Sequence, residues 1–381
     1  MRKVLSRAPR QLLYAGLLLL VIPPVLLGAG DRDRVSSSVR RSLELLQQTA
    51  ATYTDQRDCF SCHHQALPSM AVALAASRGF DVSLPQVAWQ SEFTANFFLQ
   101  RSEKLEQGSG VPGGPYTAAY AALQLAADGA REPEASQLLV TYLRKTRQQD
   151  GHWKIQTHRP PLEDSDFTAT ALSLAALRLH SQDVDAERTG QEIRQAVHWL
   201  ARNPGHTTED HVYRLLGIYW GTVDTRRGAT TRWSRLFAGR TTPGMEMEER
   251  KSFQQTVTLL LKQQHGDGGW SQLENGASDA YASGQVVAAL LGTGAARPAD
   301  ESIRRGIDYL LGLQKEDGSW HVASRSKAFQ EYFESGFPHQ KDQFISVSAS
   351  SWATMALVLS RPPRSSRSRR NEEKQDGLSP P

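Results

Sequence analysis

Two thiols and an imidazole stand within five residues near the beginning of the chain. The segment Cys59-Phe60-Ser61-Cys62-His63 places the second cysteine three residues after the first, directly before a histidine. About one helical turn at this spacing brings both sulfurs and the imidazole to one porphyrin. In an exported chain, Cys-x-x-Cys-His is the attachment signature of c-type haem. Both thiols add to the haem vinyl groups and the histidine ligates the iron. The motif therefore predicts haem c bound to Cys59 and Cys62, with His63 on the iron.

Two other uses of these residues stay open. The cysteines of an exported chain can instead form a structural Cys59–Cys62 disulfide. Both thiols can also bind zinc together with His63 or His64. The sixth iron ligand is not identified, because Met70 lies on the same helix and is too near to reach around the ring. That position is open or is filled by a distant Met or His.

A pair of aspartates forms a second candidate site. Asp164-Ser165-Asp166 stands at the start of a predicted helix, and Ser278-Asp279 opens a later one. An aspartate there caps free N–H groups and suits the helix dipole. The functional alternative is a general acid, which burial would have to keep protonated. Asp166 and Asp279 could also form the carboxylate pair of a glycosidase.

Aromatic residues stand at or near the same helix starts. They either line an apolar pocket, where they would stabilise a carbocation by cation–π contact, or pack in the core. The candidate pocket-lining residues are these aromatic residues and one acid: Tyr116, Tyr120, Phe167, Asp279, Tyr281 and Trp352.

A phrase that recurs three times indicates the elements that position these residues. It reads QQDGHW, QQHGDGGW and QKEDGSW, and it ends at Trp153, Trp270 and Trp320. Self-similarity of this kind indicates one duplicated and stacked supersecondary unit. The Asp-Gly pair predicts a tight turn at the end of a helix. We expect the three tryptophans to be structural and to fill the gap beside the next repeat.

Helical spacing of apolar residues dominates between these turns, and no segment alternates like a strand. More polar, amphipathic helices are predicted at about 35–53, 86–106, 134–148, 187–201, 247–264 and 299–314. Helices rich in Ala and Leu alternate with them at about 64–78, 116–128, 166–180, 208–219, 279–292 and 346–359. A helix that is apolar on nearly all sides must be buried on nearly all sides. The sequence therefore predicts an all-α fold: a single (α/α)6 toroid of six hairpins over about residues 34–360.

The three phrases resemble the QW repeats of the squalene-hopene cyclase and protein prenyltransferase superfamily. The resemblance covers about residues 34–360 and implies the toroid. The Asp164–Ala169 segment is similar to the Asp-x-Asp-Asp-Thr-Ala motif of class II terpene cyclases. That likeness implies Asp166 as the protonating acid, although Phe167 replaces the last aspartate. Zinc prenyltransferases hold their metal with Asp, Cys and His, but the only cysteines here lie outside that context. The Cys59–His63 motif resembles that of c-type cytochromes.

The two ends of the chain differ from its body. Residues 1–30 carry four basic side chains and no acid around the apolar stretch QLLYAGLLLLVIPPVLLGAG. This layout predicts a signal peptide, cleaved after Ala29 or Gly30, or a retained membrane anchor. Residues 361–381 carry six basic and three acidic side chains and predict a disordered tail. Since the whole chain has a net charge of +4, the body between the ends is at −3 and offers no basic groove for nucleic acid.

These features lead to three hypotheses for an exported, periplasmic or otherwise extracytoplasmic protein. The first is a toroid with haem c over one mouth, acting in redox chemistry or in binding a hydrophobic or cell-envelope ligand. The second is a terpenoid cyclase-like enzyme that uses Asp166. The third is an interaction scaffold with a Cys59–Cys62 disulfide. Membrane contact is expected only through an uncleaved N-terminal segment. In a toroid the inner helices run the same way, so we expect His63 and Asp166 at the same rim.

Overall fold

The computed structural model of the chain describes residues 29–129, 133–181, 185–223, 233–239, 244–327 and 331–362. Residues 1–28, which carry the predicted signal or anchor, and residues 363–381 of the predicted tail lie outside this description. Within the described ranges, no helix combines the length and apolar character that crossing a membrane requires. The nature of the two ends therefore stays a prediction.

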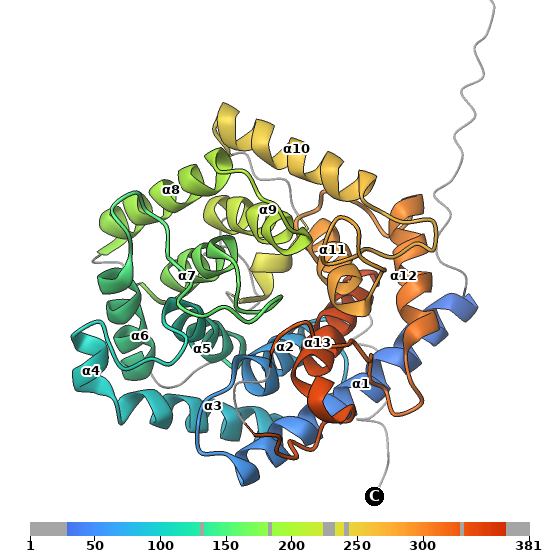
Figure 1. Cartoon of the computed structure of the whole chain (residues 1–381), viewed down its shortest axis with the longest axis horizontal. Coiled ribbons are helices and arrows are strands. Elements are labelled where there is room, and N and C mark those ends of the chain that lie inside the picture. Colours follow the sequence, from blue (N-terminus) through green and yellow to red (C-terminus); the bar gives the residue numbers. More distant parts are fainter. Residues whose placement is uncertain are drawn as a thin grey trace, which may run out of the picture.

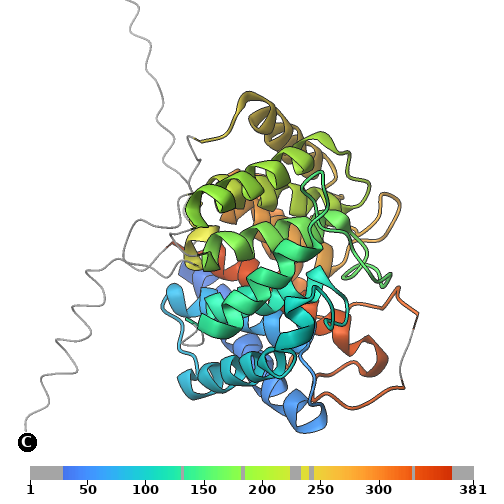
Figure 2. The ribbon, with the colours of Figure 1, turned by 90° about the vertical axis from the view of Figure 1, so that its left-hand side faces the viewer.

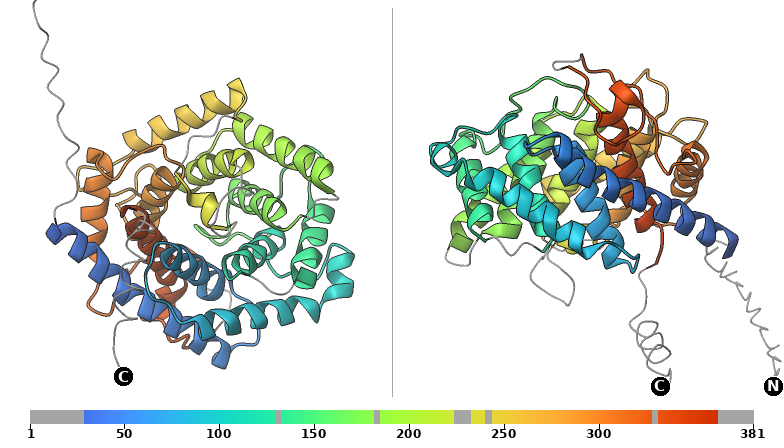
Figure 3. Two further views of the ribbon diagram at one scale, coloured as in Figure 1. Left: turned by 180° about the vertical axis from the view of Figure 1, so that it is seen from behind. Right: turned by 90° about the horizontal axis from the view of Figure 1, so that it is seen from below.

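The helices form two concentric rings, one inside the other (Figures 1 and 3). The outer ring consists of α1 (Ala29–Gln56), α3 (Leu84–Leu99) continued by the short α4 (Ser102–Glu106), α6 (Pro133–Thr146), α8 (Ala186–Arg202), α10 (Met247–Lys262) and α12 (Glu301–Leu313). The inner ring consists of α2 (Leu67–Ser77), α5 (Pro115–Ala127), α7 (Asp166–His180), α9 (Thr208–Thr222), α11 (Ala280–Gly292) and α13 (Gln343–Leu359). Shorter helical turns are η1 (Cys62–Ala66), η3 (Trp233–Phe237) and η4 (Gln340–Asp342).

This arrangement confirms the predicted all-α toroid and its alternation of outer and inner helices. Among the described residues, β-pairing is limited to two isolated bridges. Burial explains the two rings. Every residue of α11 is buried, whereas α8 buries a stripe at helical spacing, Ile193, Ala196, Val197 and Leu200. A helix with one apolar stripe can cover the core, but a helix that is apolar all round must lie within it.

The three repeated tryptophans hold each outer helix to the next inner helix. Trp153, Trp270 and Trp320 have no exposed surface. Each indole N–H donates to the carbonyl of a leucine ten residues earlier, at 2.7 Å. Each backbone N–H donates to a hydroxyl on the following inner helix, at 2.8 to 3.0 Å, on Thr170, Ser283 or Ser350. The same two hydrogen bonds in each copy make the tryptophan a core residue of the repeat.

The glycine of the repeated turn is required by its conformation. Gly151, Gly268 and Gly318 have φ of 98°, 91° and 88°, in the region that side chains rarely adopt. The turn also lies close to the next outer helix. A Cβ on Gly268 would stand 2.7 Å from the carbonyl oxygen of Arg305, and one on Gly318 would stand 2.7 Å from the backbone of Arg41.

The glutamine of the repeat shows how the ring closes. Gln264 donates from Nε2 to the carbonyl of Gly268 in its own turn and to that of Ser302 on α12. Gln314, at the equivalent place after α12, donates to the carbonyls of Gly318 and Ser38. Because Ser38 lies on α1, the last repeat contacts the first helix as an internal repeat contacts its successor. Figure 1 shows α12 and α1 side by side at this junction.

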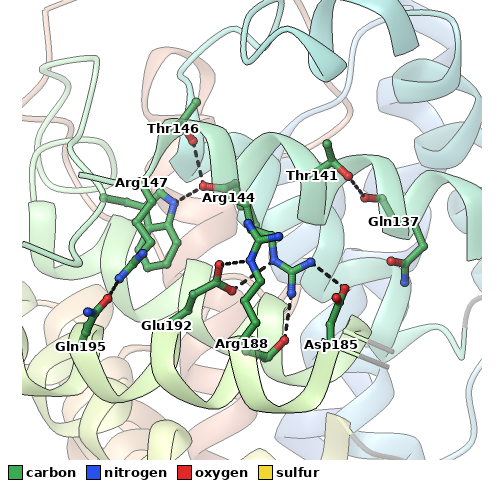
Figure 4. A network of polar contacts seen from close by, with 12 residues as sticks. Gln137, Thr141, Arg144, Thr146, Arg147, Asp185, Arg188, Glu192 and Gln195 are labelled. Atoms are coloured by element: carbon green, nitrogen blue, oxygen red, sulfur yellow. Dashed lines mark hydrogen bonds and ion pairs between the residues drawn. The ribbon is translucent and has the colours of Figure 1, made fainter. Parts of the chain in front are cut away.

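Charged side chains join neighbouring outer helices elsewhere on the ring (Figure 4). Arg144 of α6 donates to Glu192 at 3.1 Å, to Asp185 at 2.9 Å and to Thr189 at 2.9 Å. The side chains of Arg144 and Glu192 are only 12% and 9% exposed, so water screens this contact less than a surface pair. The network therefore fixes α8 against α6 on the outside of the ring.

The loops that lead into the inner helices gather at one end of the molecule. Figure 2 shows this end on the right, with the loops before α7, α11 and α13 extending beyond the helices. The N-terminal ends of the inner helices therefore share one rim, as a toroid of alternating hairpins requires.

Candidate functional site

A pocket of about 370 Å³ lies at this rim. Three segments that are distant in sequence line it: the Cys59–His64 segment before α2, the Arg159–Glu163 loop before α7, and parts of residues 326–344 before and at the start of α13. Its lining is mostly apolar, with walls made by Tyr53, Phe60, Phe97, Tyr332, Phe333 and Phe344. The volume lies within the range of small-molecule sites, roughly 300–1,000 Å³.

Both cysteines line the pocket as free thiols. Cys59 is partly exposed, and its sulfur lies 3.3 Å from the hydroxyl of Tyr53. Cys62 is buried at the start of η1, and burial raises the pKa of its thiol to about 12. Cys62 is therefore a thiol and not a thiolate at neutral pH.

The histidine pair stands beside the cysteines. The Nδ1 atoms of His63 and His64 lie 2.5 Å apart, and the ring of Tyr53 stacks on His64 at 5.0 Å between centroids. Burial, with a smaller effect of the Arg159 guanidinium, lowers the pKa of His63 to about 3. Burial and the neighbouring imidazole also lower the pKa of His64. Both rings are therefore neutral at physiological pH.

An ion pair forms another wall of the pocket. Glu163 is 4% exposed and accepts hydrogen bonds from the Arg159 guanidinium and, at 2.6 Å, from the hydroxyl of Thr157. Lys327 and Lys341 also line the pocket, and both are exposed. The lining thus carries more basic than acidic groups.

The six residues predicted to line a pocket do not line this one. Tyr116, Tyr120, Tyr281 and Trp352 are at most 1% exposed and fill the centre of the inner ring. Phe167 packs on Trp199 with 5.1 Å between ring centroids, and Asp279 caps α11 by accepting from the N–H of Ala282. The five aromatic residues all belong to the hydrophobic core of the toroid.

The two aspartates of the second candidate site lie outside the pocket. Asp166 accepts a hydrogen bond from the backbone N–H of Ile155 at 2.7 Å, and its side chain is 33% exposed. Asp164 pairs with the exposed His158. Ser165, and not Asp166, caps α7 through Phe167 and Thr168. The loop before Asp166 lies at the same rim as His63, as expected, and lines the pocket together with it. The carboxylate of Asp166 stands outside the pocket.

A buried acid that the sequence did not single out lies within the inner ring. Glu209 is 5% exposed and accepts from the hydroxyl of Tyr281 at 2.7 Å and from that of Thr168 at 3.1 Å. Burial raises its pKa to about 8. Nearby, the hydroxyls of Tyr120 and Tyr213 lie 2.7 Å apart. A buried carboxyl group near tyrosines, with no cationic partner among the described residues, is favoured in its protonated form.

The arrangement of donors bears on the alternatives for the cysteines. Among the described residues, no three His, Cys, Asp or Glu side chains are grouped so that they could hold a metal ion. The two sulfurs are unbonded, so the disulfide of the scaffold hypothesis is absent here.

Several pocket residues escaped the sequence reasoning. Arg159 and Glu163 and the aromatic residues of 331–344 come to Cys59 from other hairpins. Only His64, which directly follows the motif, carried a local signal. Cys62 and both histidines belong to η1, whereas Cys59 lies before it, outside the helical turn.

Comparison with known proteins supports the fold. Residues 232–361 match the model of the squalene-hopene cyclase C-terminal domain. A variant of the type II terpene cyclase MstE from Scytonema, solved with its product merosterolic acid A, superimposes with a TM-score of 0.50 and 14% identity, over 86% of this chain and 97% of that one. A possible member of the GH105 family from Salmonella enterica gives a TM-score of 0.50 and 14% identity, over 90% of this chain and 96% of that one. No curated protein sequence matches.

These likenesses define the class of protein. The chain is an α/α toroid with squalene cyclase-like repeats. At such low identity the two structural relatives agree with it in fold alone, and the fold does not determine the activity.

Proposed function

We propose that this protein is an exported α/α toroid that carries a covalent c-type haem in its rim pocket and uses it in electron transfer or in binding a hydrophobic or cell-envelope ligand. The observation that carries the proposal is the lining of the pocket, in which Cys59, Cys62 and His63 stand together. In the sequence these residues are a five-residue motif. In the fold they lie on a cavity large enough for a ligand.

The residues present fit this group. The two thiols are unbonded, as addition to the haem vinyl groups requires. The imidazole of His63 is neutral, as iron ligation requires. Aromatic side chains suit the faces of a porphyrin, and the ammonium groups of Lys327 and Lys341 suit its two propionates.

The chain's own residues would do three things in this function. The cysteines would hold the group covalently, and His63 would supply a nitrogen ligand to its iron. Phe97, Phe333 and Phe344 keep water from the apolar part of the pocket, which tunes the potential of a bound haem. Haem supplies a one-electron centre when it is bound. The predicted N-terminal signal or anchor would deliver the chain to the compartment in which the thioethers form.

The test is a spectrum. The full chain is produced with a haem c maturation system, extracted with acidified organic solvent and examined as the pyridine haemochrome. We expect a c-type spectrum that survives extraction, a single-thioether spectrum for Cys59→Ala and Cys62→Ala, and an altered native spectrum for His63→Ala. Asp166→Asn serves as the control and should leave all spectra unchanged. A haem-free wild-type protein would overturn the proposal.

The match to the squalene-hopene cyclase C-terminal domain favours a second candidate, terpenoid cyclisation. Its acid must be buried and protonated. Asp166 is one third exposed, whereas Glu209 is buried with a raised pKa. Haem-free protein would be incubated with squalene and the products separated by gas chromatography. A polycyclic product that disappears in Glu209→Gln or Asp166→Asn would support this candidate, and unreacted squalene would speak against it.

A further inference from the structure

We infer that His64, Ser335 and Gln343 are positioning residues that hold His63 in a single tautomer, with its Nε2 lone pair free for a ligand in the pocket. The chain of side chains Gln343–Ser335–His64–His63 is called the relay below. The identity of that ligand as a haem iron rests on the proposed function, but the tautomer itself does not.

The relay begins at a side chain whose orientation is fixed at both of its ends. Gln343 donates from Nε2 to the carbonyl of Phe333 at 2.8 Å. Its Oε1 accepts from the backbone N–H of Ser335 at 3.2 Å and contacts the Ser335 hydroxyl. Since Oε1 cannot donate, the hydroxyl of Ser335 must be the donor in that contact.

The proton of Ser335 is thus committed to Gln343, and its oxygen can only accept from other groups. His64 Nε2 lies 2.8 Å from that oxygen, so Nε2 of His64 must carry a proton. A neutral imidazole with a proton on Nε2 has a lone pair on Nδ1. His64 Nδ1 is therefore an acceptor, and its 2.5 Å partner, Nδ1 of His63, must be the donor.

The last step gives the state of His63. With its proton on Nδ1, its Nε2 carries the lone pair. Ser61 Oγ, 3.1 Å from the same Nδ1, accepts the N–H of His64 and is compatible with this assignment. Nε2 of His63 has no hydrogen bond to any described residue, and the ring lines the pocket. Ligating histidines in proteins commonly donate their other N–H in this way, which fixes the ring and raises its basicity.

Burial makes the relay rigid. His64, Ser335 and Gln343 are 1%, 0% and 6% exposed. Breaking one hydrogen bond would leave a buried polar group without a partner, which is unfavourable. The relay also spans the fold, because His64 and Ser335 are 271 residues apart in sequence. The last hairpin of the ring therefore sets the protonation of a side chain in the first.

The test reads the tautomers directly in haem-free protein. The full chain is labelled with ¹⁵N-histidine, and long-range ¹H–¹⁵N correlation spectra distinguish protonated from bare ring nitrogens. We expect His63 protonated at Nδ1 and His64 at Nε2. Ser335→Ala removes the acceptor of His64 and should populate the opposite tautomer of both rings. Ser326→Ala, at another pocket serine, is the matched control and should change neither.

A second variant covers the case in which Ser335→Ala does not fold. His64→Phe keeps a ring that can stack on Tyr53 but removes the atom that accepts from Nδ1 of His63. Both neutral tautomers of His63 should then be populated. A wild-type His63 protonated at Nε2, or an unchanged tautomer of His63 in both folded variants, would overturn the inference.

Haem-loaded protein gives an independent readout. Exogenous imidazole would be titrated against the native absorption spectrum. We expect half-displacement of His63 at a concentration about 10- to 100-fold lower in Ser335→Ala than in wild type, with Ser326→Ala unchanged. Equal titrations of Ser335→Ala and wild type would speak against positioning. Correct tautomers in a protein that takes up no haem would leave the relay standing and refute only the proposed function.

Discussion

A carboxyl group deep inside an apolar ring needs a reason to be there, and Glu209 has hydroxyl partners in place of a cation. Tyr281 and Thr168 both donate to it, and Gln285 lies at 3.5 Å. Hydroxyls can turn to accept as well as donate, so they satisfy either protonation state. Desolvation then decides the balance and favours the neutral acid, which raises the pKa to about 8.

Glu209 therefore makes stability depend on pH. In the unfolded chain the carboxyl titrates near its ordinary value of about 4.3, but in the fold it keeps its proton to about pH 8. Between these values the folded state binds more protons than the unfolded state, so the free energy of unfolding falls as pH rises. Urea unfolding should show wild type losing up to about 1.4 kcal/mol per pH unit relative to Glu209→Gln in this window.

Below pH 4, Glu209 is protonated in the folded and in the unfolded chain. The free energies of unfolding of wild type and Glu209→Gln should then change little relative to each other with pH. Parallel pH profiles for wild type and Glu209→Gln would show that the acid is already ionised in the fold.

Trp270 tests the role of the repeated tryptophan as a single residue. Its ring is fully buried against Gly306 of α12, and it joins α10 to α11 through two hydrogen bonds. Trp270→Ala should lower the free energy of unfolding by roughly 3–5 kcal/mol. The absorption spectrum of any bound group should stay unchanged, because Trp270 does not line the pocket. A thermal melt equal to wild type would refute the structural role.

At the scale of elements, the repeated turn is defined by its backbone. The carbonyls of Gln148, His265 and Lys315 accept the N–H of the glycine three residues further on. The backbone N–H of each of these residues donates to the carbonyl of the residue directly after the Asp-Gly pair. The same ladder in three copies places each turn against the next outer helix. The turn therefore sets the spacing of the hairpins as well as ending a helix.

Gly268→Ala, compared with Gly266→Ala in the same turn, tests whether the turn requires glycine. Alanine at φ of 91° is strained by about 1–3 kcal/mol, and its Cβ would meet Arg305. Gly266→Ala adds a methyl group where nothing lies within 4 Å, and its φ is not in the strained region. Denaturant unfolding should show a loss of at least about 1–3 kcal/mol for the first variant and about 0.5 kcal/mol or less for the second. Equal losses would mean that the turn does not require glycine.

The elements could be predicted from the sequence because their signals are local. The Asp-Gly-x-Trp turns and the apolar character of segments such as 279–292 depend on residues that are neighbours in the chain. The pocket depends on residues that are not. Phe333, Gln343 and Glu163 reach Cys59 and His63 only because the ring closes. Nothing in the sequence around these three residues indicates that they line a pocket. Whether Tyr116 and Tyr281 line a pocket or pack in the core stayed open, because helix ends alone do not reveal how closely inner helices pack.

At the scale of the whole molecule, closure turns a row of hairpins into a rim with a pocket. The first hairpin supplies the cysteines and the last supplies Ser335 and Gln343. An open superhelix would hold these parts apart and would leave both the pocket wall and the tautomer of His63 undefined. Stability of the ring junction and chemistry at the pocket are thus linked properties.

Gln314→Leu and Gln264→Leu compare the closing junction with an internal one. Each glutamine joins a turn to the next outer helix through two carbonyls. The acceptor on that helix is 276 positions from Gln314 in the sequence but only 38 positions from Gln264. If the ring is closed in solution, both variants should lose a similar free energy of unfolding, about 1–3 kcal/mol, because two buried or half-buried acceptors lose a donor in each. Hydrogen exchange should then quicken in α1 and α12 for Gln314→Leu and in α10 and α12 for Gln264→Leu. A silent Gln314→Leu beside a destabilising Gln264→Leu would mean that the first and last hairpins do not meet, and the pocket between them would lose its basis.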